Sequence, residues 1–377
     1  MPRTLKEQLP WTQSPIIANA PMGGFAGGAL AAAVTAAGGL GQIGAVVDMG
    51  ELERELTLAQ KSLPRSKSNG DTSNNNTISC SSTTLPIGVG LLTFILKLES
   101  VLPLLQRFQP SVIWLFAASE LNDYTTWTRS LHAALPHSSI WIQVGSASAA
   151  LTVARGDASD ASTQPDALVL QGSDAGGHGF EHSASIVSLV PETLDLLAAH
   201  GLSALPVLAA GGIADARGAA AAFALGAAGV VLGTRFLAAR ETIVPHEAYR
   251  DAVLSAKDGS TSTVRSKVFD NVKGPNIWPG EYDGRSLVTR SYTDFVDGVD
   301  IGVVRERHAD AAKRADAGFA DTTDGEAKSS GNGAGRRANV WAGASVGLVN
   351  ELQDAGDVVR EVRKGVDEAL KAARARL

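Results

Sequence analysis

A histidine on glycine-rich backbone is the first feature of this sequence that could do chemistry. His178 lies in the stretch LVLQGSDAGGHGF (168–180), between Gly177 and Gly179. Backbone without Cβ atoms can approach a ligand closely, and histidine is the side chain whose unperturbed pKa lies near neutrality. The residue could therefore transfer a proton or donate a hydrogen bond to an anion. Histidines in turns are also common, so this stretch alone leaves a structural role open.

A second stretch, VLAAGGIADARG (207–218), could bind a phosphate. An apolar run leads into Gly211 and Gly212, and Asp215 follows where it can cap a helix. Free backbone N–H groups would then point at an anion, with the positive end of the helix behind them. A tight turn that requires positive φ explains this one stretch equally well.

A third stretch, VVLGTRF (230–236), makes the phosphate interpretation stronger. Gly233 would supply backbone N–H donors, Thr234 a hydroxyl and Arg235 a cation. Two neighbouring strand ends with such residues are typical of the composite phosphate site of barrel enzymes.

These residues must be positioned by the elements that precede them. Short apolar runs alternate with helical patterns, which is typical of βαβ units and a parallel sheet. We expect eight strands, at PIIANAP (15–21), LGQIGAV (40–46), PIGVGLL (86–92), VIWLFAA (112–118), SIWIQVG (139–145), ALVLQG (167–172), PVLAAGG (206–212) and GVVLGTRF (229–236).

Eight such units predict an α/β fold, a (β/α)8 TIM barrel. An open doubly wound sheet stays an alternative at this point, because PMGGFAGG (21–28) puts a glycine-rich turn after the first strand. The barrel is favoured because the strongest glycine signals follow the seventh and eighth strands.

We expect the barrel over residues 1–257, followed by an irregular and helical C-terminal extension over 258–377. The extension should pack on the barrel and end in an amphipathic helix that contains Val359 and Val362. Residues 64–84 are almost purely polar and cannot bury enough apolar surface to order, so they are predicted to be a disordered surface insertion.

Composition limits the class of function. The chain has 377 residues with 44% hydrophobic residues, enough for a sizeable core. Its net charge of −6 disfavours nucleic acid as a partner. The single cysteine, Cys80, cannot form an internal disulfide, and no metal site is expected, since His182 has no matching ligand set. A monomer and a homodimer both stay open.

The sequence also bears on location. The N-terminus shows no signal or transit pattern, so a cytoplasmic protein is expected. Residues 25–47 are uncharged, but glycines interrupt them, and a buried helix and strand explain them better than a membrane span.

Flavin mononucleotide (FMN) fits the predicted phosphate site. Its phosphate would lie over the seventh and eighth strands, and its ring would reach the barrel mouth near the first and sixth. Ala20, Pro21 and Met22 end the first strand as a small, stiff wall, and Gln171 ends the sixth with an amide that can donate and accept. His178 would lie on a loop over the ring.

Several stretches, in this order along the chain, resemble the nitronate monooxygenase family, formerly called 2-nitropropane dioxygenases, and particularly its fungal members. The resemblance covers nearly the whole chain except residues 64–84. The matching stretches are APMGG (20–24), WIQVGSAS (141–148), VLQGSDAGGHG (169–179), PVLAAGGIADARG (206–218), GVVLGTRFLAARE (229–241), VRSKVFDNVKGPNIWPGEYDGR (264–285) and WAGASVGLV (341–349).

The resemblance implies an FMN-dependent enzyme that oxidises alkyl nitronates with O2 to carbonyl compounds and nitrite, without a nicotinamide. His178 matches the catalytic histidine of the family. It would remove a proton from a neutral nitroalkane or stabilise a nitronate anion, and whether neutral nitroalkanes are used stays open. The implied cofactor-binding residues are Ala20, Pro21, Met22, Gln171, Gly176 and Gly177 near the flavin, with Gly211, Gly212, Gly233 and Thr234 at its phosphate.

One departure from the family is visible. Many bacterial members have an asparagine at the end of the third strand, where this chain has Gly90, and Thr93 is a candidate replacement. Two other functions stay open: an NAD(P)H-dependent flavin reductase of the enoyl-acyl carrier protein reductase type, and a non-catalytic barrel that binds FMN or a sugar phosphate.

Overall fold

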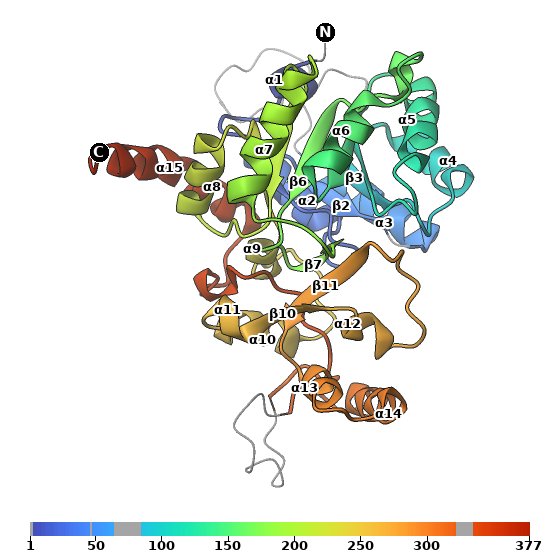
Figure 1. Ribbon diagram of the computed structural model, residues 1–377, viewed down its shortest axis with the longest axis vertical. Helices are drawn as coiled ribbons and strands as arrows, with labels where there is room; N and C mark the ends of the chain where they lie inside the picture. Colours follow the sequence, from blue (N-terminus) through green and yellow to red (C-terminus); the bar gives the residue numbers. More distant parts are fainter. Residues whose placement is uncertain (1–2, 46, 64–83, 322–334) are drawn as a thin grey trace.

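The computed structural model describes residues 3–45, 47–63, 84–321 and 335–377 (Figure 1). The predicted insertion at 64–84 lies outside the described residues except for Thr84, and Cys80 lies outside them too.

Eight parallel strands form a nearly closed barrel, which confirms the predicted fold and excludes the open doubly wound sheet. Around the barrel the order is β1-β9-β8-β6-β5-β4-β3-β2. A bridge between Ala18 and Leu40 connects β1 to the residues just before β2 and brings the ends of the sheet together. The strands are β1 (Ile17–Asn19), β2 (Gln42–Gly44), β3 (Leu85–Leu92), β4 (Pro110–Phe116), β5 (Ser139–Val144), β6 (Ala167–Gln171), β8 (Val207–Ala210) and β9 (Gly229–Leu232).

These strands are continuous apolar runs because both of their faces are covered, by the helices outside and by side chains inside. Trp114 of β4 and Trp141 of β5 are fully buried in the barrel interior. Their indole N–H groups donate to Gln143 and Gln8 respectively, so neither leaves a buried donor without a partner. The eighth strand is shorter than predicted: it ends at Leu232, and a short helix begins at Thr234.

The helices of the barrel lie outside the sheet, where Figure 1 shows them around the strands. They are α2 (Gly28–Ala36), α3 (Met49–Ser62), α4 (Leu98–Phe108), α5 (Asp123–Ala134), α6 (Ala147–Arg155), α7 (Ile186–Ala199) and α8 (Ala216–Ala224). The remaining elements are α1 (Leu5–Gln8), α9 (Thr234–Leu237), α10 (Glu247–Ser255), α11 (Gly259–Ser262), α12 (Val268–Asn271), α13 (Arg290–Val296), α14 (Ile301–Ala312), α15 (Ala355–Arg374) and the 3-10 turns η1 (Ala161–Thr163) and η2 (Val346–Leu348).

The C-terminal helix α15 takes the place of the eighth barrel helix. It packs against α8 on one side and α2 on the other, which are the neighbours that an eighth helix would have. Its apolar stripe, which includes Val359 and Val362, is buried. Arg363 adds hydrogen bonds from its guanidinium to the carbonyl groups of Ala37 and Gly38 at the end of α2. The last helix therefore closes the outer layer of the barrel.

A second, antiparallel sheet lies at one end of the barrel, below it in Figure 1. It consists of β10 (Thr263–Ser266), β11 (Tyr282–Leu287) and β7 (Gly177–Phe180), in the order β10-β11-β7. The first two strands belong to the region after residue 257, whereas β7 follows β6 in the barrel. The sheet thus joins the histidine segment to the extension.

No helix among the described residues is long and apolar enough to cross a membrane. The uncharged stretch 25–47 instead contains the helix α2 and the strand β2, as predicted. Both are largely buried in the barrel.

Candidate active site

A cavity of about 550 Å³ opens where the barrel strands end and the second sheet begins. Its size is in the range of ordinary small-molecule and cofactor sites. The ends of β1, β6 and β9 line one part of it, and the extension lines the other. Carboxyl ends of strands are where (β/α)8 barrels hold their active sites.

The structure brings most of the predicted site residues to this one cavity. Gly211 and Gly212 are the exceptions. The predicted residues that line the cavity are Ala20, Pro21, Met22, Gln171, Gly176, Gly177, His178, Gly233 and Thr234.

The backbone at Gly211 and Gly212 is covered by the segment after β6. Both residues have positive φ, 102° and 74°. A Cβ on Gly211 would lie 2.9 Å from the carbonyl oxygen of Gly172, and one on Gly212 would lie 3.1 Å from the Cβ of Asp174. The tight-turn interpretation of this stretch therefore accounts for both glycines. Asp215 caps α8 as predicted, because its carboxylate accepts hydrogen bonds from the backbone N–H groups of Arg217 and Gly218.

Two polar residues follow the eighth strand. The hydroxyl of Thr234 lies at the cavity, and the guanidinium of Arg235 points away from it. Thr234 Oγ1 accepts a hydrogen bond from the Gly343 N–H at 2.9 Å, which leaves its own proton free to donate. Arg235 is 8% exposed and donates to the Glu351 carbonyl at 3.3 Å and to the side chain of Gln353. Burial lowers the pKa of Arg235. It does not line the cavity, so the prediction that it supplies a cation there was wrong.

His178 lies on a strand and not on a free loop as predicted. In β7 it is paired with Gly284 of β11. Its backbone carbonyl accepts a hydrogen bond from Gln171 Nε2 at 3.0 Å, so the amide that ends β6 holds β7 beside the barrel. The position of the histidine is therefore set from both sides, by the barrel and by the extension.

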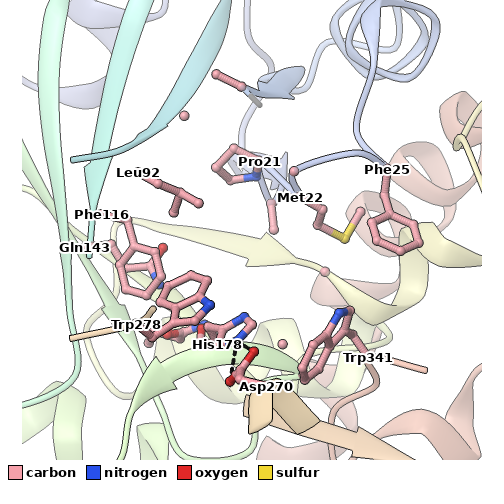
Figure 2. A pocket seen from close by; sticks show the side chains of 18 of the residues that line it. Pro21, Met22, Phe25, Leu92, Phe116, Gln143, His178, Asp270, Trp278 and Trp341 are labelled. Carbon is pink, nitrogen blue, oxygen red and sulfur yellow. Dashed lines mark hydrogen bonds and ion pairs between the residues drawn. The ribbon is translucent and has the colours of Figure 1, made fainter. Parts of the chain in front are cut away.

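The side chain of His178 is paired with a carboxylate. Its Nε2 lies 2.9 Å and 3.0 Å from the two carboxylate oxygens of Asp270, as the dashed lines in Figure 2 mark. Only 14% of the histidine side chain and 9% of the aspartate side chain are exposed. An ionised carboxylate can only accept, so Nε2 carries a proton, and Nδ1 has no hydrogen-bond partner among the described residues.

Two tryptophans enclose this pair, one on each side of the histidine in Figure 2. The ring of Trp278 stacks on that of His178, with centroids 3.7 Å apart and planes 10° apart. Trp341 is tilted by 52° at 4.7 Å. Gly284 makes room for the second indole, since a Cβ there would lie 2.5 Å from the Trp341 ring. These contacts restrict the imidazole to one orientation.

The end of β3 explains the glycine that departs from the family pattern. A Cβ on Gly90 would lie 2.4 Å from the Cβ of Pro21, so the proline ring fills the space that a side chain at position 90 would need. Thr93 is no replacement for an asparagine here, because its hydroxyl donates to the Phe116 carbonyl at 3.3 Å and it does not line the cavity.

Comparison with known proteins shows which protein family has a similar sequence. The family model for nitronate monooxygenase matches residues 125–272. A nitronate monooxygenase of Metarhizium robertsii, npaC, is 38% identical over 366 residues, which cover 96% of this chain and 93% of the relative. The nitronate monooxygenase of Neurospora crassa is 36% identical over 388 residues, 98% of this chain and 94% of the relative.

The chain belongs to the nitronate monooxygenase family. It is therefore related to enzymes, and the resemblance found in the sequence is confirmed.

Solved structures with a similar fold agree with the barrel of this family member. FabK from Thermotoga maritima has a TM-score of 0.71 at 23% identity, covering 100% of this chain and 99% of that one. Nitroalkane oxidase from Streptomyces ansochromogenes has a TM-score of 0.66 at 21% identity, covering 98% and 99%.

The sequence did not predict the cavity residues that the extension contributes in this member of the nitronate monooxygenase family. The stretch 264–285 was noted as a family match, but no role was expected for its residues. Asp270 lies on the short helix α12, and Lys273 and Trp278 lie on the segment that follows it. Segments of this kind often carry functional residues. Nothing in their spacing relates them to a histidine far earlier in the chain. The missed lining residues are Asp270, Lys273, Trp278 and Trp341.

Proposed function

We propose that this protein is an FMN-dependent nitronate monooxygenase, which oxidises alkyl nitronates with O2 to carbonyl compounds and nitrite. The observation that carries the proposal is the His178–Asp270 pair, held in the same cavity as the residues expected to contact a flavin. Membership of the family supplies the reaction class.

The residues present fit a flavin and its phosphate. Ala20, Pro21 and Met22 offer a wall of small and apolar groups. Thr234 has a hydroxyl proton free for an anion. A Cβ on Gly177 would meet no atom within 4 Å, so the backbone there is open to a ligand. FMN bound here would accept electrons from the substrate and pass them to O2.

With a neutral nitroalkane, the nitrogen of His178 that can act as a base is Nδ1. Asp270 accepts from Nε2, which holds the ring in the tautomer whose Nδ1 lone pair is free. The nitro group acidifies the neighbouring C–H, so an imidazole nitrogen with a free lone pair can take that proton. The carboxylate of Asp270 then stabilises the imidazolium that forms, as in other carboxylate–histidine pairs.

With a nitronate, which is already ionised, the same arrangement serves a different purpose. A protonated His178 would donate from Nδ1 to a nitronate oxygen, with Nε2 still bonded to Asp270. Hydrogen bonds between ionised groups are the strong ones. The apolar side chains of Leu92, Phe116 and Trp278 around the cavity limit the access of water to this contact.

The proposal is tested by mixing the purified protein with propyl-2-nitronate without oxygen and following the absorbance of its flavin. We expect the flavin to be reduced, and, when air is admitted, nitrite and acetone to appear. Release of the cofactor by heat identifies it as FMN. A colourless protein, or a flavin that NADPH bleaches rapidly while the nitronate does not, would overturn the proposal in favour of a binding protein or a reductase.

A further inference from the structure

A glutamine of the cavity has only one half of its amide group bonded to protein. Gln143 lies on β5, is 7% exposed and lines the cavity together with Trp114. Its Oε1 accepts a hydrogen bond from the Trp114 indole N–H at 3.0 Å. Its Nε2, which can donate, has no acceptor among the residues that the structure describes.

The indole determines which end of this amide faces the cavity. An indole N–H can only donate, so the amide oxygen of Gln143 must lie toward Trp114. Trp114 is 1% exposed and packs beside Trp141, with ring centroids 6.1 Å apart, which holds it in place. The Nε2 group is therefore left for the cavity in a fixed orientation.

A second glutamine shows how a purely structural amide is bonded in this fold. Gln8 of α1 lies at the end of the barrel away from the second sheet (Figure 1) and also accepts from an indole, that of Trp141, at 2.9 Å. Its Nε2 donates to the carbonyl oxygens of Arg3 and Asp166, each at 2.9 Å. A donor kept from water without an acceptor costs free energy. The open donor of Gln143 therefore indicates an acceptor that a ligand supplies.

The position of this donor favours the cofactor over the substrate. Gln143 belongs to the part of the cavity that the barrel strands line, as do Ala20 and Gly90, whereas His178 and Trp278 line the other part. A flat ring against the barrel wall would lie on the side of Gln143 and leave His178 to the substrate. A flavin ring has carbonyl oxygens and ring nitrogens that can accept the hydrogen bond.

We propose that Gln143 donates a hydrogen bond from Nε2 to an acceptor atom of the flavin ring, in the orientation that Trp114 sets, and so raises the reduction potential of the bound flavin. The acceptor atoms become more negative when the ring takes up electrons, so the bond stabilises the reduced cofactor more than the oxidised one. The inference rests on the proposed function for the identity of the cofactor. The contact itself transfers no electron and no proton.

Two replacements remove the donor in different ways. Gln143→Glu keeps an oxygen for the Trp114 N–H, and Gln143→Leu removes both halves of the amide without adding a charge. The reduction potential of the FMN-loaded protein is measured by equilibration with a reference dye. The dissociation constant of FMN is measured by dilution of the loaded protein and fluorescence of the released cofactor.

We expect both variants to bind reduced FMN about tenfold more weakly relative to oxidised FMN. Each factor of ten lowers the potential of a two-electron couple by about 30 mV. Trp114→Phe keeps an aromatic ring but lacks the N–H that orients the amide, so it should lower the potential by less. The matched control is Gln8→Leu, which removes the other indole-bonded amide and should lower thermal stability at an unchanged potential.

An unchanged potential in Gln143→Leu would overturn the inference, and so would a fall in Gln143→Glu alone, since that is the effect of an added charge. An equal fall in Gln8→Leu would overturn it too. Should the leucine variant fail to fold, Gln143→Met repeats the measurement. Oxidation of nitronates by the unmodified protein would leave the proposed function standing in each case. A potential that follows Gln143 in a protein inactive on nitronates would overturn only the proposed function, and an unmodified protein that binds no FMN would overturn both.

Discussion

His178 and Asp270 are separated by 92 positions in the chain, yet their side chains are 2.9 Å apart. At the scale of the residue, this contact gives the two ring nitrogens of His178 different roles. Nε2 is bonded to Asp270, and Nδ1 is free for a substrate. Neither side chain has that property alone.

Replacement of His178 by asparagine separates its two roles. Asparagine keeps a hydrogen-bond donor but cannot serve as a base near neutral pH. We expect kcat/KM for neutral nitroethane to fall about 10²- to 10⁴-fold, and that for the preformed ethyl nitronate to fall much less. Steady-state oxygen uptake measures both. An equal loss on the two substrates would argue against a base.

Replacement of Asp270 by asparagine should act through the histidine. The amide can no longer stabilise an imidazolium, so kcat/KM for nitroethane should drop about 10²-fold or more. Turnover of the nitronate should be affected less. The control is Asp251→Asn, at an exposed aspartate outside the cavity. Nitroethane turnover as high in D270N as in D251N would contradict the assigned contact.

At the scale of the element, the cavity depends on the close approach of β3 to the segment that follows β1. Pro21 occupies the space beside Gly90. A Gly90→Ala variant must therefore displace the proline from the cavity wall that is proposed to contact the flavin. We expect a loss of about 1–3 kcal/mol in the free energy of unfolding, and less flavin per chain.

Thermal unfolding and the flavin absorbance of the purified variant measure these two effects. The matched control is Gly23→Ala, also at the cavity, where an added Cβ meets only the Ala45 carbonyl oxygen, at an ordinary 3.8 Å. Flavin content as high in G90A as in G23A would contradict the expected displacement.

The helix α5 carries a contact whose strength depends on pH. The ring nitrogens of His132 lie 2.8 Å from the Ser162 carbonyl oxygen and 3.0 Å from an Asp166 carboxylate oxygen. Burial would lower the pKa of His132, but the bonds to Asp166 and Ser162 outweigh it and raise the pKa.

A histidine whose folded pKa is raised adds stability that is complete below its unfolded pKa and is lost as the pH rises through the folded value. His132→Gln should therefore lower the free energy of unfolding by about 1 kcal/mol at pH 5.5, and by less at pH 8.5. Urea unfolding of both proteins at the two pH values measures this. A larger loss in the free energy of unfolding at pH 8.5 than at pH 5.5 would contradict the raised pKa of His132.

At the scale of the whole molecule, the last helix completes the outer layer of the barrel. Because α15 fills the outer layer between α8 and α2, the barrel contains residues from both ends of the sequence. The predicted boundary between 257 and 258 stays a prediction, but these contacts associate α15 with the barrel.

A charge on the buried side of α15 should show how much the barrel depends on it. Val362 is 3% exposed, so Val362→Asp places a carboxylate in the core and should cost about 3 kcal/mol or more in the free energy of unfolding. Leu370→Asp, on the same helix at 39% exposure, is the control and should cost little. Equal midpoints in denaturant for the two variants would show that α15 is not part of the barrel's cooperative unit.

The second sheet also joins segments that are far apart in the sequence, because it connects the extension to the candidate site. Strand β7 comes from the barrel and β11 from the extension, and their register sets His178 opposite Gly284. Trp278 and Trp341 complete the enclosure. The candidate site is therefore built jointly by the barrel and the extension.

The sequence by itself determined the eight barrel strands and the family, because apolar runs and ordered motifs are local signals, whereas it left open whether Gly211 and Gly212 form a tight turn or bind a phosphate. Only the tertiary structure decided the partner of His178, the direction of Arg235 and the place of α15. These depend on strand pairing and packing between segments far apart in the chain, where spacing carries no information about contact. The same folding also left Nε2 of Gln143 without an acceptor among the described residues, which no pattern of residues could show.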